Sequence, residues 1–233
     1  MKSVVLIGAT QGIGREMAAE YDRQGANVVI TGRNAERATD VASELSKDGP
    51  GTVTGLPLDL TRPGEIVAAL TTIGRVDRLV IIGMIRDHNS LADYNVATAT
   101  DLAVTKVVGY TAVVSALFPR MAPDASILLF GGMAKEYPHP GSTTVSAVNA
   151  AVTGLVRTMS VELSPVRVNA IHPGPIEDSP YWTENPGMLD AYRKLSLTGR
   201  LGSMADVVNA CLFLLESPIA NGIDLHADGG RRR

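Results

Sequence analysis

Short apolar runs alternate along the chain with segments that repeat their apolar residues every three or four positions. Seven runs rich in β-branched residues are predicted to be strands, at residues 3–7, 27–31, 52–58, 78–82, 126–130, 166–171 and 222–225. Six segments have helical periodicity, at residues 12–24, 35–47, 64–72, 98–117, 143–162 and 204–216. The strand runs are apolar on consecutive residues, which is typical of strands that helices cover on both faces.

This alternation predicts an α/β fold: a doubly wound parallel sheet (Rossmann fold) of about seven strands with helices on both faces. No linker, internal repeat or low-complexity segment interrupts the pattern. With 233 residues and 45% hydrophobic content, the chain is long enough for one sizeable core. We therefore expect residues 1–233 to form a single domain.

Charge and cysteine content narrow the class of function. The 21 basic and 24 acidic residues leave a formal charge of −3, without the basic excess typical of nucleic-acid-binding proteins. Cys211 is the single cysteine and the four histidines show no HExxH spacing, so we expect neither a disulfide nor a metal site. No apolar stretch approaches the roughly 20 residues that a membrane span requires. The sequence predicts a cytoplasmic protein that acts on a small-molecule substrate and binds neither nucleic acid nor membrane.

A glycine-rich segment follows the first predicted strand directly and opens the first predicted helix. Its residues are Gly8, Ala9, Thr10, Gln11, Gly12, Ile13 and Gly14. Glycine allows a tight turn and a close approach of backbone N–H groups to a pyrophosphate, whose charge the helix N-terminus stabilises. Alone, the segment could be an ordinary strand-to-helix turn. Within a βαβ unit it predicts a dinucleotide site.

The end of the second predicted strand indicates which dinucleotide is bound. An acidic residue there would bind the adenosine ribose and repel a 2′-phosphate, but the chain has Gly32, Arg33 and Asn34. Gly32 leaves room, and Arg33 has a guanidinium suited to phosphate. The sequence therefore predicts NADP(H), the alternative being that Arg33 is simply an exposed residue at a strand end.

With these motifs, the chain resembles the short-chain dehydrogenase/reductase family over nearly its full length. Further matches are Asp59 and Leu60, which resemble the pair that holds the adenine, and residues 168–176, which resemble the segment that supports the nicotinamide. The resemblance implies cofactor contacts at these positions: Asp59, Leu60, Ile82, Gly83, Pro173, Gly174 and Ile176. It also implies an oxidoreductase, a substrate lid around residues 175–197, and a homodimer or homotetramer paired through residues 98–117 and 143–162 and through the last helix and strand.

The residues that carry the family's chemistry do not match. The family has a tyrosine and, four residues later, a lysine on one helix, where this chain has Val145 and Asn149. Gly132 stands at the family's serine position, and Lys106 at that of its asparagine. None of the six tyrosines precedes a lysine by four residues. Lysine and asparagine have thus exchanged places, and we expect Lys106 to point into the cleft toward Asn149 as the catalytic pair. The alternative is a lysine on the surface or at a subunit interface.

Three functions remain open at this stage. The first is an atypical NADP(H)-dependent reductase of a C=O or C=N group with a non-standard active site. The second is a non-redox enzyme, such as an isomerase, cyclase or lyase, on the same scaffold, and the third is a catalytically inactive cofactor-binding protein. Loop residues 87–89, 136–139 and 177–179 add further polar candidates around the cleft, including His88, His139 and Asp178.

Overall fold

The computed structural model describes residues 1–47 and 49–231, and seven strands form one parallel sheet among them. The strand order is β3-β2-β1-β4-β5-β6-β7. The strands are β1 (Ser3–Ile7), β2 (Asn27–Gly32), β3 (Thr52–Pro57), β4 (Val76–Ile81), β5 (Met121–Phe130), β6 (Arg167–Pro173) and β7 (Asp224–Ala227). The predicted fold class, a doubly wound parallel sheet with helices on both faces, is confirmed.

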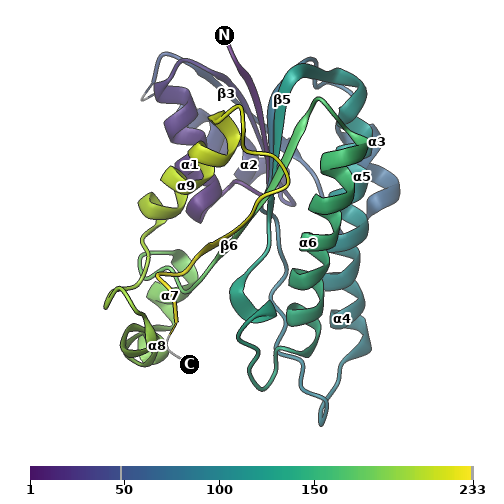
Figure 1. Cartoon of the computed structure of the whole chain (residues 1–233). Helices are drawn as coiled ribbons and strands as arrows, with labels where there is room; N and C mark the ends of the chain where they lie inside the picture. The colour runs from purple at the N-terminus through teal and green to yellow at the C-terminus, as the bar shows by residue number, and fades with distance from the viewer. Residues whose placement is uncertain (48, 232–233) are drawn as a thin grey trace.

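Two layers of helices cover the sheet (Figure 1). One face carries α1 (Gly12–Arg23), α2 (Ala35–Leu45) and α9 (Met204–Glu216). The other face carries α3 (Ile66–Ala69), α4 (Val96–Ala103), α5 (Tyr110–Leu117) and α6 (Thr143–Glu162). Val4 and Leu6 of β1 pack into the first layer, whereas Val5 and Ile7 pack into the second. The two separate cores explain why the strand runs are apolar on consecutive residues.

Several predicted elements differ in their bounds, and β5 begins at Met121 rather than at residue 126. The expected helix at residues 64–72 is a 3-10 turn, η1 (Pro63–Glu65), followed by the single turn α3. The last strand begins at Asp224 rather than at residue 222, because Gly222 adopts a positive φ of 71° in the preceding turn.

The segment Val96–Arg120 is long and apolar enough to cross a membrane by length and composition alone. In this structure it is a core helix: Leu102, Tyr110 and Val113 are fully buried. A π-helical turn, η2 (Val104–Gly109), connects α4 to α5 within it. Such turns shift the register of a helix and are frequent at functional sites.

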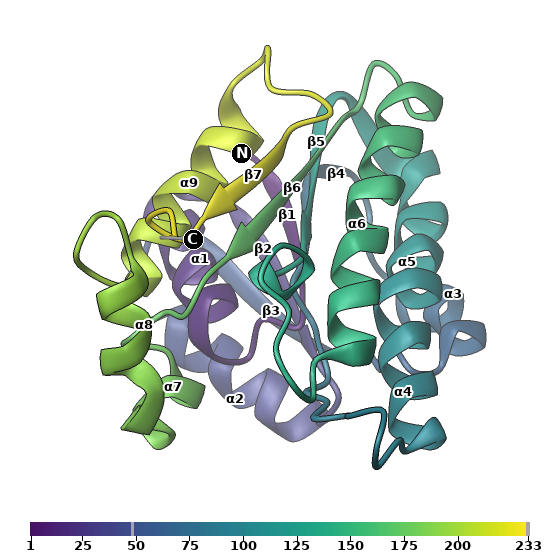
Figure 2. The ribbon, with the colours of Figure 1, turned by 60° about the horizontal axis from the view of Figure 1, so that its bottom comes forward.

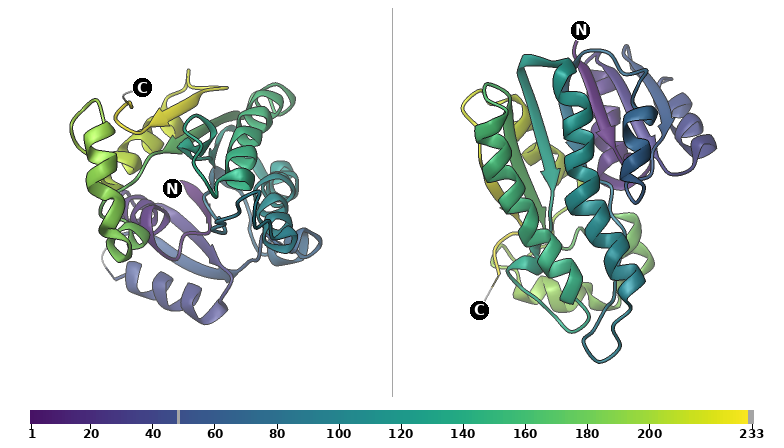
Figure 3. Two further views of the ribbon diagram at one scale, coloured as in Figure 1. Left: turned by 90° about the horizontal axis from the view of Figure 1, so that it is seen from below. Right: turned by 90° about the vertical axis from the view of Figure 1, so that its right-hand side faces the viewer.

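The strand order reverses between β1 and β4, the position where ligands bind in open α/β sheets. Figure 3 (left) looks onto the carboxyl ends of the strands, and Figure 2 shows β6 and β7 side by side at one edge. Two short helices, α7 (Pro180–Glu184) and α8 (Leu189–Leu195), lie near this end of the sheet (Figure 1).

Candidate functional site

A cleft of about 1140 Å³ opens at the carboxyl ends of the strands. Every site residue expected from the sequence lines it except Gly14, which is packed against Ala9 one turn inside α1. A Cβ atom at Gly14 would lie 2.7 Å from Ala9 Cα, so this glycine shapes the turn rather than the cleft surface.

The turn between β1 and α1 exposes backbone amides to the cleft. Gly8 has a φ of 85°, and a Cβ there would lie 2.4 Å from Gly83 Cα, so only glycine fits between these strand ends. Gln11 precedes α1 without a side-chain cap, which leaves the first amides of this 12-residue helix free. Free amides and a positive helix end facing a cleft fit a pyrophosphate.

The turn after β2 supplies positive charge at one end of the cleft. Arg33 is exposed there, and Gly32 packs so closely on Thr10 that a Cβ would lie 2.7 Å from Thr10 Cγ2. The Asn34 side chain caps α2 by accepting the Arg37 N–H at 2.8 Å. Arg37 also lines the cleft and donates to Gln11 Oε1 at 2.7 Å. The sequence analysis missed Arg37, although its position three residues after a capping asparagine would have placed it in the first turn of α2.

Residues at and after the carboxyl ends of β3, β4 and β6 form the rest of the groove. Asp59 Oδ1 accepts hydrogen bonds from the backbone and hydroxyl of Thr61, at 3.0 and 2.8 Å. Leu60 packs on Gly83, where a Cβ would lie 2.8 Å from Leu60 Cδ1. The further expected contacts also face the cleft: Ile82, Pro173, Gly174 and Ile176. These residues and the β1–α1 turn together fit an extended dinucleotide.

Lys106 and Asn149 meet at the floor of the cleft. Lys106 lies in η2, is 1% exposed, and donates to Asn149 Oδ1 at 2.9 Å. Its other two N–H groups reach the carbonyl oxygens of Phe130, at 2.9 Å, and Gly131, at 3.0 Å. Burial lowers the pKa of this ammonium from 10.5 to about 7. All three N–H groups are therefore used by the protein, and none points at a substrate.

The contact with Lys106 determines how the Asn149 amide is oriented. Because Oδ1 accepts from the ammonium, Nδ2 must take the other side, next to Gly132. A Cβ at Gly132 would lie 2.8 Å from Nδ2, so a serine at this position would collide with the amide. Gly132 and Asn149 therefore fit one another. Val145 does not line the cleft.

A buried polar chain, which the sequence analysis missed, fixes the backbone beside Gly132. The Gly132 N–H donates to His172 Nδ1 at 3.1 Å, so His172 Nε2 carries the proton and donates to Asp224. Asp224 also contacts Lys135 and accepts from Thr153 at 3.0 Å. Burial lowers the pKa of His172 to about 4; burial raises that of Asp224, but Lys135 and His172 hold it below its ordinary value. A neutral imidazole with a defined tautomer follows.

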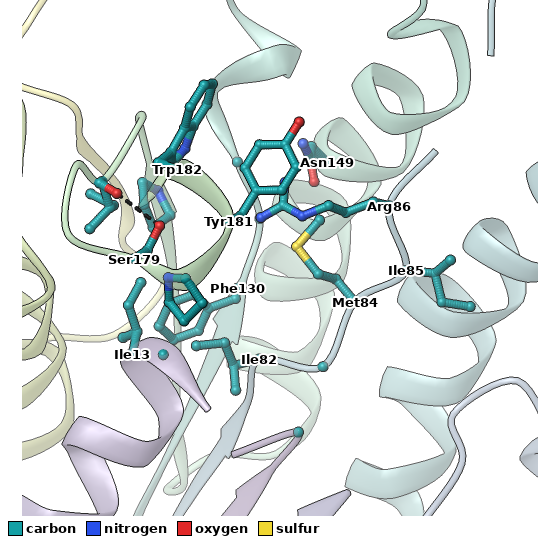
Figure 4. Close-up of a pocket in the computed structure, with 18 of the residues that line it drawn as sticks. Ile13, Ile82, Met84, Ile85, Arg86, Phe130, Asn149, Ser179, Tyr181 and Trp182 are labelled. Carbon is teal, nitrogen blue, oxygen red and sulfur yellow. Dashed lines mark hydrogen bonds between the residues drawn. The ribbon is translucent and has the colours of Figure 1, made fainter. Parts of the chain in front are cut away.

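The segment at residues 175–197 forms one wall of the cleft. Trp182 makes edge-to-face contacts with Tyr181 and Tyr192, with ring centroids 5.1 and 5.5 Å apart. Ser179, Tyr181 and Trp182 surround the pocket in Figure 4. Among the other polar candidates, His139 lines the cleft, whereas His88 does not and Asp178 accepts from the Met204 backbone N–H at the start of α9. Over the described residues, no three of the histidine, cysteine and carboxylate side chains gather as a metal site.

Comparison with known proteins gives the family. A sequence model described as "Enoyl-(Acyl carrier protein) reductase" matches residues 8–232. The chain belongs to the short-chain dehydrogenase/reductase family. It is 28% identical to the 3-oxoacyl-(acyl-carrier-protein) reductase FabG of Aquifex aeolicus, over 98% of this chain and 96% of the relative. It is 31% identical to the 7alpha-hydroxysteroid dehydrogenase of Escherichia coli K12, over 95% and 89%.

A solved structure extends the comparison. The MalC Reductase/Diels-Alderase from Malbranchea aurantiaca superposes with a TM-score of 0.90 and 25% identity, over 98% of this chain and 95% of that one. Because relatives of this chain are oxidoreductases and the family uses NAD(P)(H), an oxidoreductase that binds a nicotinamide dinucleotide is the general assignment.

Proposed function

We propose that this protein is an NADP(H)-dependent reductase of a C=O or C=N group that works without the family's serine, tyrosine and lysine. The observation that carries the proposal is the Lys106–Asn149 contact at the floor of the dinucleotide cleft. When bound, the reduced nicotinamide supplies the hydride. Asn149 Nδ2 is the donor for a carbonyl oxygen of the substrate, and Lys106 positions and polarises that amide.

The choice of NADP(H) rests on charge at the adenosine end. Arg33 and Arg37 both line this part of the cleft, and Gly32, which has no side chain, lies between Thr10 and Arg33 without obstructing it. A 2′-phosphate would gain charge-assisted hydrogen bonds there, each worth roughly 1.5 to 3 kcal/mol.

The missing general acid restricts the substrate. A positioned acid contributes about 10²- to 10⁴-fold to rate, and here Val145, which cannot donate a proton and does not line the cleft, stands at the family's tyrosine position. A reduced carbonyl must take its proton from water, whereas an iminium carbon accepts hydride and leaves a neutral amine without any proton transfer. Electrophilic carbonyls and iminium ions are therefore the substrates that this site favours.

A non-redox reaction is the second candidate, because one relative bears a name that joins reductase to Diels-Alderase. In that case the Asn149 amide would polarise a substrate oxygen while the dinucleotide stays unreacted.

A cofactor-binding protein without turnover is the third candidate. We also propose that the chain acts on a small molecule as a soluble, cytoplasmic homodimer or homotetramer, with residues 175–197 as its substrate lid.

One experiment separates these functions. NADPH and NADH are titrated into the protein by calorimetry, and loss of nicotinamide absorbance is then followed with a panel of activated ketones and cyclic iminium ions. We expect NADPH to bind about tenfold or more tighter than NADH, and Arg33→Ala to weaken NADPH by about 10- to 100-fold with little effect on NADH. Equal weakening of both coenzymes would refute the NADP(H) assignment, and saturable binding without oxidation would favour a non-redox reaction.

A further inference from the structure

Arg86 is a cation in the cleft that neither the cofactor groove nor the Lys106–Asn149 pair uses. It lies in the loop after β4, lines the cleft and is exposed to the solvent that fills the cleft. Its guanidinium stacks on the ring of Tyr181, with Cζ 3.4 Å from the ring centroid. Figure 4 shows Arg86 and Tyr181 reaching each other from opposite walls, with Met84 beside them. The stack fixes the plane of the guanidinium and leaves its N–H edge free.

No protein anion neutralises this arginine. Within residues 1–47 and 49–231, Arg86 makes no hydrogen bond and no ion pair. Even the adjacent carboxylate of Asp87 does not contact its guanidinium as an ion-pair partner. Arg193 of α8 instead binds Glu177 at 3.0 Å. The neighbouring walls desolvate Arg86, which lowers the pKa of its guanidinium. A partly desolvated cation without a partner gains most from an anion that a ligand brings.

The residues around Arg86 indicate the chemical character of the rest of that ligand. Met84, Tyr181, Trp182 and Tyr192 form apolar and aromatic walls near Arg86. Arg33 and Arg37, in contrast, lie at the β2–α2 turn, so the adenosine phosphate does not need Arg86.

We propose that Arg86 and Tyr181 form the binding site for a carboxylate on an otherwise apolar substrate. The guanidinium edge binds both carboxylate oxygens, while the aromatic wall covers the carbon skeleton. The site deepens the proposed function by naming the substrate class, and it rests on that function only in placing the substrate in this cleft. Arg86 is then a specificity residue that orients the substrate and takes no part in the chemical step.

The chain's single tryptophan provides the readout. Trp182 contacts Tyr181, so its fluorescence reports directly on this wall. The probes are 3-phenylpropionate and the uncharged 3-phenylpropionamide, titrated into the full chain with NADPH present. We expect the carboxylate to bind the wild type about 10- to 100-fold tighter than the amide. Arg86→Met should remove that difference, and Arg86→Lys should keep only part of it because lysine lacks the planar fork.

Arg231→Met is the matched control. Arg231 also stacks on a tyrosine of the cleft, with Cζ 4.8 Å from the ring centroid of Tyr137, so the variant removes the same charge and leaves the Arg86 stack intact. The proposal is overturned if Arg231→Met loses as much carboxylate affinity as Arg86→Met, if the amide binds as well as the carboxylate, or if neither probe changes the fluorescence. It is also overturned if Arg86→Met weakens NADPH equally, since Arg86 would then serve the cofactor. Failure of redox turnover would leave this binding result unaffected.

Discussion

At the scale of single residues, the contact between Lys106 and Asn149 has a definite geometry. The sequence predicted that Lys106 faces Asn149, and the structure brings Nζ within 2.9 Å of Oδ1. The sequence could not indicate that two backbone carbonyls would take the remaining N–H groups. In the proposed function, that detail makes Lys106 a positioning residue and Asn149 Nδ2, which lies next to Gly132, the donor to the substrate.

Removing the Asn149 amide tests this division of roles. We expect Asn149→Ala to lower kcat by about 10²- to 10³-fold, the usual cost of one donor to a developing oxyanion, while the Kd of NADPH stays unchanged. Steady-state kinetics and calorimetry measure the two quantities. A loss of NADPH affinity with normal kcat would instead assign Asn149 to the cofactor site.

The pH dependence tests Lys106 separately. Burial lowers its pKa to about 7, so the ammonium that holds Asn149 is present below pH 7 and is lost as the pH rises through that value. We therefore expect kcat to fall above about pH 7 in the wild type. Lys106→Met should have a low kcat without this limb, and a limb that persists in the variant would contradict the assignment.

At the scale of elements, the sequence predicted structure that depends on neighbouring residues better than contacts between residues far apart in the chain. The bounds of α6 agree with the prediction at both ends, and the glycine turn after β1 follows from its own sequence. The chain from Gly132 through His172 and Asp224 to Lys135 was missed. Its members come from the segment after β5, from β6 and from β7, and the contacts between them join residues 40, 52 and 89 positions apart. No local periodicity carries information on such contacts.

The packing of α2 on β3 gives a prediction for stability. A Cβ at Gly55 in β3 would lie 2.1 Å from the Ala38 carbonyl oxygen of α2, so Gly55→Ala must push the helix away. We expect a loss of about 1 to 3 kcal/mol in the free energy of unfolding, measured by denaturant titration. In the control Gly64→Ala, a Cβ meets nothing within 4 Å, and we expect no loss. Equal stability of the two variants would contradict the prediction, because α2 could then move away from β3 at no cost in free energy.

At the scale of the whole molecule, the expected pairing through the long helices cannot use their most apolar faces, which are buried. Val113, Leu117, Val152 and Val156 lie inside the chain's own core and are not free to meet a partner. The apolar residues exposed on these helices and their ends are Val96, Val108, Phe118 and Val161. A homodimer or homotetramer would therefore use the outer faces of α4 to α6.

Sedimentation velocity tests this assembly. We expect the wild type to sediment as a dimer or tetramer, and Val108→Glu to shift it toward the monomer because a buried charge opposes the contact. Val67→Glu, which changes an exposed valine on α3, should leave the assembly intact. A monomeric wild type would contradict the proposal.

The contact between Asp224 and His172 also sets an order of events during biosynthesis. Synthesis releases the N-terminal region first, so β1 and the glycine turn can pack early. The imidazole that holds the Gly132 amide gains its carboxylate only when β7, which carries Asp224, has been synthesised. The residues that line the nucleotide groove would therefore all be synthesised before the residue that completes the reaction chamber.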